Sequence, residues 1–505
     1  MATLRKWPWQ ATLTIGIVLG ILLLAGLGVW LAVQRMQPSL VEPSEQLMQA
    51  ARRLDEITID AKLDAENHSM AVRQVLMLIN DGEEPRDAVV LRTWPNAFQK
   101  PDTSPIAGNS DLCPEGFSAG SLVMEESELV RQDGATAVAH RYLDEAKTVL
   151  SLPLEAPWQP GERLTVVLKY TVHFPHAQYR FGWWENTVMA GQTFAMPALW
   201  QDGAYRTDAY LPIGDPLSGE CVNIHLSLTL PKGYTCGVTG QIIGVQQSPD
   251  GTSNYLVEAP AVREVGLVMG SDLHVADRTV NGTLVEAIAA KPAEAKKLLN
   301  DAADALETFS KLYGAYPYPT YTACAMPMGV SGAEYPGMVM IAQSLLKDDE
   351  LEYTVAHETA HQWWYGLVGS DSSTHPWLDE ALCEFSLLEY VEDRHGRAAR
   401  EELRKSRVES AMRVTVAGQA TPGAPLDYFE TGTDYMVLVY GRATSLLCAM
   451  DDWLDGQLDQ VLRRYAETYA FSMADRADFT QLVLEETGLD MEPLMVDYLD
   501  TYLLN

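Results

Sequence analysis

The chain has 505 residues, of which 47% are hydrophobic and 21% charged, a composition typical of a folded protein with room for two or three domains. With 36 Lys and Arg against 69 Asp and Glu, its formal net charge is −33. This excess of negative charge argues against nucleic acid as a partner and indicates an acidic, solvated exterior.

The first predicted element is a membrane anchor. Residues 11–33 read ATLTIGIVLGILLLAGLGVWLAV, without a charge. At about 1.5 Å per residue, a helix of this length spans the roughly 30 Å apolar layer of a bilayer. Arg5 and Lys6 precede the run and no small-residue cleavage site follows it, so we expect residues 1–34 to be a cytoplasmic tip and an uncleaved anchor. The protein is then expected in the cell membrane as a single-pass protein, with its remaining residues outside the cytoplasm.

The next stretch predicts a stalk and a β domain. Proline and polar residues in 35–51 indicate a short stalk. Between 52 and 272, short alternating runs such as RLTVVLKYTVHF and NIHLSLTL are separated by clusters of Asn, Asp, Gly and Pro. We therefore expect a β-sandwich or a curled sheet. Cys221 and Cys236 fall in neighbouring strand-like segments, and the sequence leaves open whether they form a disulfide or stay free.

The composition changes near residue 285. Residues 285–314, VEAIAAKPAEAKKLLNDAADALETFSKLYG, carry apolar residues at three- and four-residue spacing and end in Gly, as helices do. Further helical stretches, at 351–366 and from Trp377 onward, predict a mainly helical domain over 273–505. The predicted fold class is therefore α+β, with an anchor helix, an N-terminal β domain and a helical C-terminal domain.

The helical domain contains a histidine pattern, HETAH, at 357–361. Residues four apart on an α-helix lie about one turn apart on one face, so His357 and His361 can direct imidazole nitrogens at one ion. Zinc needs a third protein ligand, and Glu380 is the candidate, because the 18 residues after His361 allow a loop and a second helix. We therefore predict one Zn²⁺ per chain. The alternative is a solvated helix on which His and Glu are merely paired.

Three further acidic residues fit such a site. Glu358 can reach a water on the zinc without binding the ion, and zinc lowers the pKa of its water from about 15.7 to about 7. Glu358 can then accept the proton and pass it to a leaving amine, which is the chemistry of a metallopeptidase. Glu384, one turn after Glu380, and Asp379 are expected to accept the outer N–H groups of the histidines, although Glu384 can also be an ordinary exposed residue.

These residues carry a resemblance to a known family. VAHETAHQWW, followed by WLDEAL, resembles the gluzincin zinc aminopeptidases, which include the alanyl aminopeptidases and leukotriene hydrolase. The resemblance covers most of residues 50–450 and implies a saddle-shaped β domain followed by a thermolysin-like catalytic domain. Because the chain ends about 125 residues after Glu380, we expect a short form without the family's C-terminal helical domain.

The resemblance also implies a substrate-binding segment. In VSGAEYPGMVMI, residues 330–341, Glu334 matches the glutamate that binds the free α-amino group of the substrate in this family, with Gly332 and Ala333 beside it. A carboxylate fixed one residue's length from the metal favours a cationic peptide terminus. The sequence departs from the family here, because Ala333 stands for the usual Met and Tyr335 for the usual Asn.

A tyrosine completes the implied site. Tyr440, in DYMVLVYGRATSLL, resembles the family's tyrosine before Lys-Gly-Ala, with Arg in place of Lys. One hydrogen-bond donor to an oxyanion can contribute about 3 kcal/mol. Tyr435, five residues earlier, is the rival for this role.

The predicted function is that of a membrane-anchored zinc aminopeptidase, with peptides that have a free N-terminus as substrates. Two alternatives remain, an endopeptidase with the same zinc chemistry and a catalytically inert cell-surface binding protein. The presence of Glu358 beside a complete ligand set favours an enzyme, since an inert relative has no need of a base.

Overall fold

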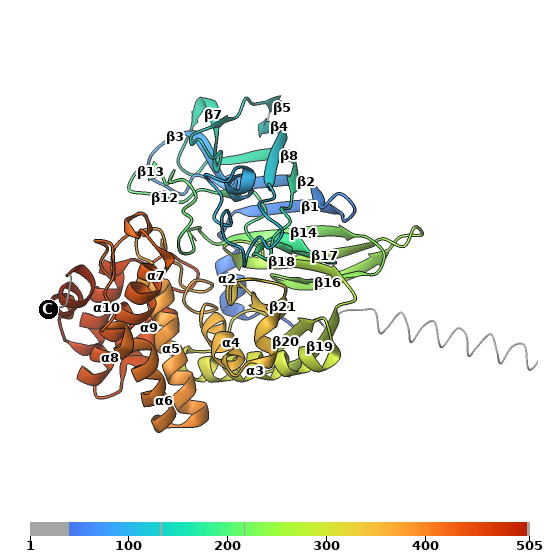
Figure 1. The fold of residues 1–505 in the computed structure, drawn as a ribbon. Helices are drawn as coiled ribbons and strands as arrows, with labels where there is room; N and C mark the ends of the chain where they lie inside the picture. Colours follow the sequence, from blue (N-terminus) through green and yellow to red (C-terminus); the bar gives the residue numbers. More distant parts are fainter. Residues whose placement is uncertain (1–39, 132–133, 217, 502–505) are drawn as a thin grey trace, which may run out of the picture.

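The computed structural model describes residues 40–131, 134–216 and 218–501 (Figure 1). The N-terminal half is built on an eight-stranded sheet. Across that sheet the strands follow the order β16 (Gln241–Gln247), β17 (Ser253–Val262), β14 (Val222–Leu230), β1 (Glu56–Asp64), β2 (Ser69–Ile79), β8 (Arg163–His173), β4 (Ser121–Arg131) and β5 (Gly134–Ala137). The pair β1 and β14 is parallel, and the other neighbours are antiparallel.

Side chains on this sheet alternate between a buried and a more exposed face. In β8, Val166, Leu168 and Tyr170 are buried while the intervening Val167 and Lys169 are not. This is the pattern of a sheet with one face on a core. The predicted β character of this half is therefore confirmed.

Smaller sheets complete the N-terminal half. One has the order β15 (Tyr234–Val238), β18 (Leu267–Ser271), β10 (Thr187–Ala190) and β9 (Phe181–Trp184); a second has β11 (Met196–Pro197), β3 (Arg86–Arg92), β7 (Val149–Trp158) and β6 (Arg141–Tyr142); β12 (Trp200–Gln201) pairs with β13 (Ala204–Tyr205). A 3₁₀ helix, η1 (Trp94–Gln99), follows β3. One hydrophobic core runs from this half, where it includes Ile57, into the helical half, where it includes Trp363.

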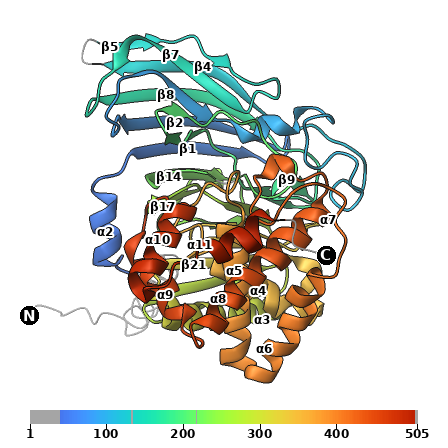
Figure 2. The same ribbon diagram turned by 90° about the vertical axis from the view of Figure 1, so that its left-hand side faces the viewer.

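The C-terminal half combines a five-stranded sheet with helices, which lie below the large sheet in Figure 2. The sheet order is β19 (His274–Val280), β20 (Thr283–Ala289), β21 (Thr320–Met326), β23 (Met338–Ala342) and β22 (Gly332–Tyr335), with β22 antiparallel at the edge. The main helices are α3 (Pro292–Tyr313), α4 (Glu350–Ala360), α5 (Trp377–His395), α6 (Arg397–Leu403), α7 (Gly432–Tyr435), α8 (Thr444–Trp453), α9 (Leu458–Thr468), α10 (Arg476–Thr487) and α11 (Glu492–Met495). Shorter 3₁₀ segments are η2 (Gln343–Lys347) and η4 (Leu426–Tyr428), and π-helical segments are η3 (Arg404–Glu409), η5 (Met436–Ala443) and η6 (Val496–Asp500).

The helix predicted over 285–314 is correct only in its second part. Its first residues belong to strand β20, which pairs with β19 on one side and with β21 on the other. Helix α3 begins at Pro292, because proline at the first helical position needs no N–H partner. The expected domain boundary at residue 272 falls between β18 and β19.

The segment expected to be a stalk, 35–51, contains a helix in its described part. Helix α2 (Glu45–Ala51) begins at Ser44, whose side chain accepts a hydrogen bond from the backbone N–H of Leu47, and Leu47 is fully buried. The side chain of Gln241 also holds the backbone of Val41 through two hydrogen bonds. Residues 40–51 are therefore docked on the β domain.

The predicted membrane anchor, residues 11–33, lies outside the described residues. Within 40–131, 134–216 and 218–501, no helix is long and apolar enough to cross a membrane. All six cysteines lie in these ranges and are buried and free, which places Cys221 and Cys236 among the free thiols.

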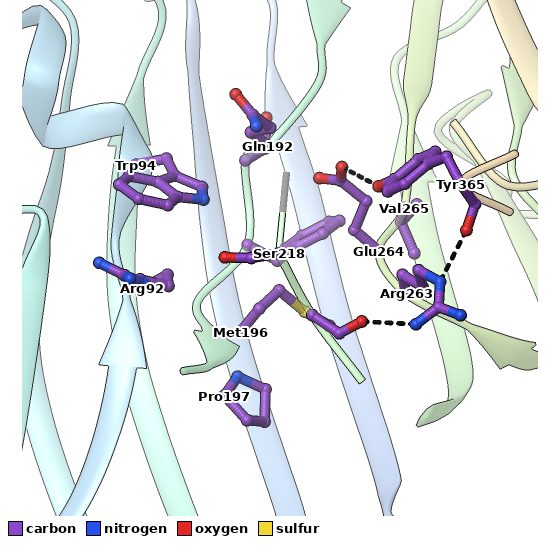
Figure 3. A pocket seen from close by; sticks show the side chains of 13 residues that line it. Arg92, Trp94, Gln192, Met196, Pro197, Ser218, Arg263, Glu264, Val265 and Tyr365 are labelled. Atoms are coloured by element: carbon purple, nitrogen blue, oxygen red, sulfur yellow. Dashed lines mark hydrogen bonds between the residues drawn. The ribbon is translucent and has the colours of Figure 1, made fainter. Parts of the chain in front are cut away.

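A buried arginine connects the two halves (Figure 3). Arg263, just after β17, donates hydrogen bonds to the backbone carbonyls of Tyr365 at 2.7 Å, Gly219 at 2.7 Å and Ser472 at 2.8 Å. A Cβ atom on Gly369 would lie 2.3 Å from the guanidinium carbon of Arg263, so this close approach requires glycine.

Next to Arg263, Glu264 is buried and accepts a hydrogen bond from the hydroxyl of Tyr365 at 2.5 Å. Burial raises the pKa of Glu264 to about 7, although the hydrogen bond from Tyr365 opposes this effect. Between its unfolded and folded pKa values, the folded protein binds a proton that the unfolded chain has released. The contribution of Glu264 to the free energy of unfolding therefore falls as pH rises from about 4.5 to about 7.

Glu264→Gln should remove this pH dependence. The difference in free energy of unfolding between the variant and the wild type should shift by about 3 kcal/mol in favour of the variant from pH 5 to pH 8. The reason is that glutamine keeps a neutral group in the buried position at both pH values. Urea unfolding of both proteins at the two pH values measures the difference. Glu66→Gln, at an exposed turn, is the matched control and should leave the pH profile unchanged. An unaltered profile in Glu264→Gln would show that this carboxyl does not carry the effect.

Candidate metal centre and active-site cleft

Two helices bring the three predicted zinc ligands together. Helix α4 carries His357 and ends with His361 at its C-cap, and α5 carries Glu380 in its first turn. The Nε2 atoms of His357 and His361 lie 3.3 Å and 3.6 Å from Oε2 of Glu380. All three side chains are buried, and one ligand atom from each lies within 4.8 Å of the others.

The outer ring nitrogens of both histidines face carboxylates. His361 Nδ1 lies 2.7 Å from Oδ1 of Asp379, and His357 Nδ1 lies 3.1 Å from Oε1 of Glu384. Nδ1 of His361 is hydrogen-bonded to Asp379, whereas Nδ1 of His357 lies close to Glu384 without forming a hydrogen bond. In both rings, Nε2 faces Glu380 and is available to a metal ion. This arrangement, in which carboxylates orient ligating histidines, is frequent in zinc sites.

The charges of the site favour a bound cation. Burial alone would lower the pKa of His357, but Glu380 and Glu384 raise it to about 10. Burial would raise the pKa of Glu380, yet the two histidines lower it well below its usual range. The pocket therefore has a strongly negative potential, which protons or a divalent ion can neutralise. The donor set of two imidazoles and one carboxylate fits Zn²⁺ with one position left open.

Two other groups of side chains have metal-ligand spacing. One consists of His361, Asp379 and Cys383, and the other of Glu334, Glu358 and His361. Burial raises the pKa of the Cys383 thiol far above its usual value, which disfavours the thiolate that zinc binds. The group with Glu380 is therefore the best zinc site among the described residues.

Two buried glutamates have oxygens without a partner. Oε2 of Glu358 and Oε1 of Glu334 accept no hydrogen bond among the described residues. Burial raises the pKa of both, to about 8 for Glu334. A Cβ atom on Gly332 would lie 2.1 Å from Oε1 of Glu358, so glycine is needed for the edge strand β22 to pass this close to α4. Buried acceptors in this state are suited to a water molecule or a substrate ammonium group.

The packing around Glu334 explains why Ala333 and Tyr335 replace the residues that are usual in the family. The side chains of Ala333 and Tyr335 belong to a buried apolar cluster. Tyr335 fits there because Gly191 and Gly266 have no side chain, and a Cβ on Gly191 would lie 1.8 Å from the tyrosine hydroxyl. Gly332 lines the cleft, whereas the side chain of Ala333 points into the core.

Both candidate tyrosines line the cleft. The Tyr440 ring, on η5, stacks on the ring of His357 with centroids 5.6 Å apart and planes at 18°. Tyr435 is more buried, and its ring lies edge-on to Tyr440 at 5.7 Å. Tyr440 is thus in direct contact with a predicted ligand, and Tyr435 lies behind it.

The cleft has a volume of about 900 Å³ and receives residues from both halves of the chain. The β domain contributes Tyr179, Arg180 and Asp215, of which Arg180 and Asp215 form an ion pair. On the other side, Arg407 of η3 lines the cleft. These residues lie outside any sequence motif, and only the path of the chain brings them to the site, so they could not be predicted from the sequence.

The chain is similar to peptidases of family M1. A family model described as the peptidase family M1 domain matches residues 298–498. Aminopeptidase M1-B of rice is 26% identical over 263 residues, which are 48% of this chain and 30% of the relative. Aminopeptidase M1 of Arabidopsis thaliana is 31% identical over 156 residues, which are 28% of this chain and 17% of the relative. The chain thus spans less than a third of the length of these relatives.

Solved structures show the same fold. The M1 zinc metallopeptidase E323A mutant from Deinococcus radiodurans superposes with a TM-score of 0.64 at 15% identity, covering 90% of this chain and 96% of that one. The form described as bound to a Tyr-Ser-Ala substrate has a TM-score of 0.62, covering 89% and 94%. The predicted resemblance to the gluzincin aminopeptidases is confirmed, since residues 298–498 match the peptidase family M1 domain and the solved M1 structures share the fold.

Asp379→Asn should weaken zinc binding about 10- to 100-fold, because the charge that orients and polarises His361 is lost. Competition with a chromophoric chelator measures the zinc dissociation constant. Asp393→Asn, at the far end of the same helix, where Asp393 pairs with Lys311, is the control and should bind zinc like the wild type. Equal affinities in all three proteins would remove Asp379 from the metal centre.

Proposed function

We propose that the protein is a zinc aminopeptidase, which hydrolyses the first peptide bond of substrates with a free amino terminus. The observation that carries the proposal is the buried group of His357, His361 and Glu380 in a cleft where Glu358 and Glu334 have unpartnered oxygens. The names of the similar plant proteins and the tripeptide described with the Deinococcus enzyme support the same activity.

His357, His361 and Glu380 would hold a zinc ion, which would supply Lewis-acid polarisation of the scissile carbonyl and a lowered pKa for the attacking water. Glu358 lies next to the first histidine ligand, and its free Oε2 can accept the proton of that water. The protonated Glu358 can then donate this proton to the leaving amine, because an amine leaves slowly without protonation. The close approach of Gly332 restricts the carboxyl of Glu358 on the β22 side, which favours a fixed orientation.

Two further residues orient the substrate. Glu334 stands on β22, whose outer edge has no partner strand among the described residues, so an extended peptide can align beside it. Its carboxylate can bind the α-ammonium group at a fixed distance from the site, which selects the terminal peptide bond. The hydroxyl of Tyr440, above His357, can donate a hydrogen bond to the oxyanion that develops on the scissile carbonyl.

Two substitutions separate these roles from metal binding. Glu358→Gln should retain one zinc ion yet lose about 10²- to 10⁴-fold in kcat, because proton transfer is lost. Tyr440→Phe should lose about 10²- to 10³-fold in kcat with zinc retained. Tyr435→Phe is the matched control and should be nearly unaffected. Full turnover by Glu358→Gln would refute the mechanism. A larger loss of kcat in Tyr435→Phe than in Tyr440→Phe would assign the role of oxyanion donor to Tyr435 instead.

A peptide with a free amino terminus and its N-acetylated twin test the exopeptidase action. The wild type should cleave the acetylated peptide about 10- to 100-fold more slowly in kcat/KM, since the charge-assisted contact with Glu334 is lost. Glu334→Gln should remove most of this preference, while Glu467→Gln, at an exposed ion pair with Arg464 outside the cleft, should keep it. Equal cleavage of the two peptides by the wild type would favour the endopeptidase alternative.

We further propose that residues 11–33 anchor the protein in the cell membrane with the catalytic half outside the cytoplasm. The support is the uncharged sequence and the basic residues before it. Fractionation of cells that express the full chain should place it in the membrane pellet, resistant to extraction by carbonate. Protease added to intact cells or spheroplasts should digest it. Recovery in the soluble fraction would contradict the proposal.

A further inference from the structure

A single oxygen of Glu384 is shared between a predicted zinc ligand and an arginine. Oε1 of Glu384 lies 3.1 Å from Nδ1 of His357, and Nη1 of Arg407 donates a hydrogen bond to the same oxygen at 3.1 Å. The other end of the Arg407 guanidinium donates to Oε2 of Glu350 at 2.7 Å. Arg407 therefore bridges a carboxylate at the metal centre and a carboxylate at the rim of the cleft.

This bridge restrains a side chain that would otherwise have several rotamers. The side chain of Glu384 is 7% exposed, whereas those of Arg407 and Glu350 are 31% and 54% exposed. A buried carboxylate needs partners for its charge, and the planar guanidinium can hold two carboxylates in fixed directions. Arg407 thus fixes the position of Glu384 from the solvent side.

We infer that Arg407 is a positioning residue for the metal centre, which holds Glu384 against Nδ1 of His357 and so keeps Nε2 of His357 directed at the ion. The inference rests on the proposed zinc site. Neither the ligand pattern nor the comparisons assign a role to Arg407.

The packing around η3 supports this role. A Cβ atom on Gly441 of η5 would lie 2.2 Å from Cβ of Ala411, just beyond η3, so the two segments touch at a glycine. Arg442 also donates a hydrogen bond to the carbonyl of Ala411 at 3.2 Å. The segment that carries Arg407 and the segment that carries Tyr440 are therefore packed together. His357 therefore has the Glu384 carboxylate 3.1 Å from its Nδ1 atom and the ring of Tyr440 stacked on its face.

Helix η3 offers a matched control. Arg404 lies one turn before Arg407 and donates a hydrogen bond to Asp452 at 2.9 Å, and the Asp452 side chain is 58% exposed. Arg404→Met and Arg407→Met therefore remove the same charge from the same helix. Only Arg407→Met removes a contact with Glu384.

The experiment measures zinc dissociation constants of the full chain by competition with a chromophoric chelator. Arg407→Met and Glu384→Gln should each weaken zinc binding about 10- to 100-fold, while Arg404→Met should stay within about twofold of the wild type. The double variant should bind zinc no more weakly than Glu384→Gln alone, because both changes act through one carboxylate. Arg407→Lys should fall between Arg407→Met and the wild type, since an ammonium cannot hold both carboxylates as the guanidinium does.

A second measurement separates positioning from a general loss of structure. With Co²⁺ in place of zinc, the visible absorption bands should change in the same way in Arg407→Met and Glu384→Gln and stay as in the wild type in Arg404→Met. Zinc affinity in Arg407→Met equal to that of the wild type would overturn the inference. So would losses that add in the double variant. If the wild type itself binds no zinc, the proposed function fails instead, so the two failures are distinguishable.

Discussion

The structure depends on a concentration of buried negative charge around two imidazoles. Five carboxylates surround the histidines, and none is more than 7% exposed: Glu334, Glu358, Asp379, Glu380 and Glu384. Like charges in a buried site repel one another strongly, and removing them from water is unfavourable. A divalent cation at the point where both Nε2 atoms and Glu380 converge would neutralise much of this negative charge. In the proposed mechanism, these carboxylates have distinct roles, as ligand, base, amine anchor and orienting acceptor.

The fold holds these groups in register through contacts outside the site. Trp364, after the second histidine, donates a hydrogen bond from its indole N–H to Ser386 of α5 at 2.8 Å, which ties the two ligand-bearing helices together. The hydroxyl of Tyr321 on β21 hydrogen-bonds with that of Thr359 on α4 at 2.7 Å. The ligand helices are thus fixed to each other and to the sheet whose edge strand carries Glu334. Such preorganisation is what electrostatic catalysis requires of a scaffold.

The sequence predicted the parts of the site that follow from local geometry. His357 and His361 are one helical turn apart, and the loop before Trp377 sets the position of Glu380, so their convergence needs little beyond helix formation. Arg180, Asp215 and Arg407 could not be predicted, because their neighbours in space are far away in the chain. Residues 285–289 were predicted as helix from composition, yet they form part of a strand because they pair with β19 and β21. Here the tertiary context overrides the intrinsic helix propensity. Helix α2 was missed for the same reason, since the burial of Leu47 against the β domain stabilises it.

The central claim is that one zinc ion is held by His357, His361 and Glu380. Zinc-edge X-ray absorption spectroscopy of the purified protein tests it most directly, because it distinguishes nitrogen and oxygen ligands at about 2.0–2.2 Å from sulfur at about 2.3 Å. We predict one zinc ion per chain with two imidazoles and only nitrogen and oxygen ligands, and loss of that signal in Glu380→Gln. A sulfur ligand, which would indicate Cys383, or a protein that binds no zinc would contradict the account.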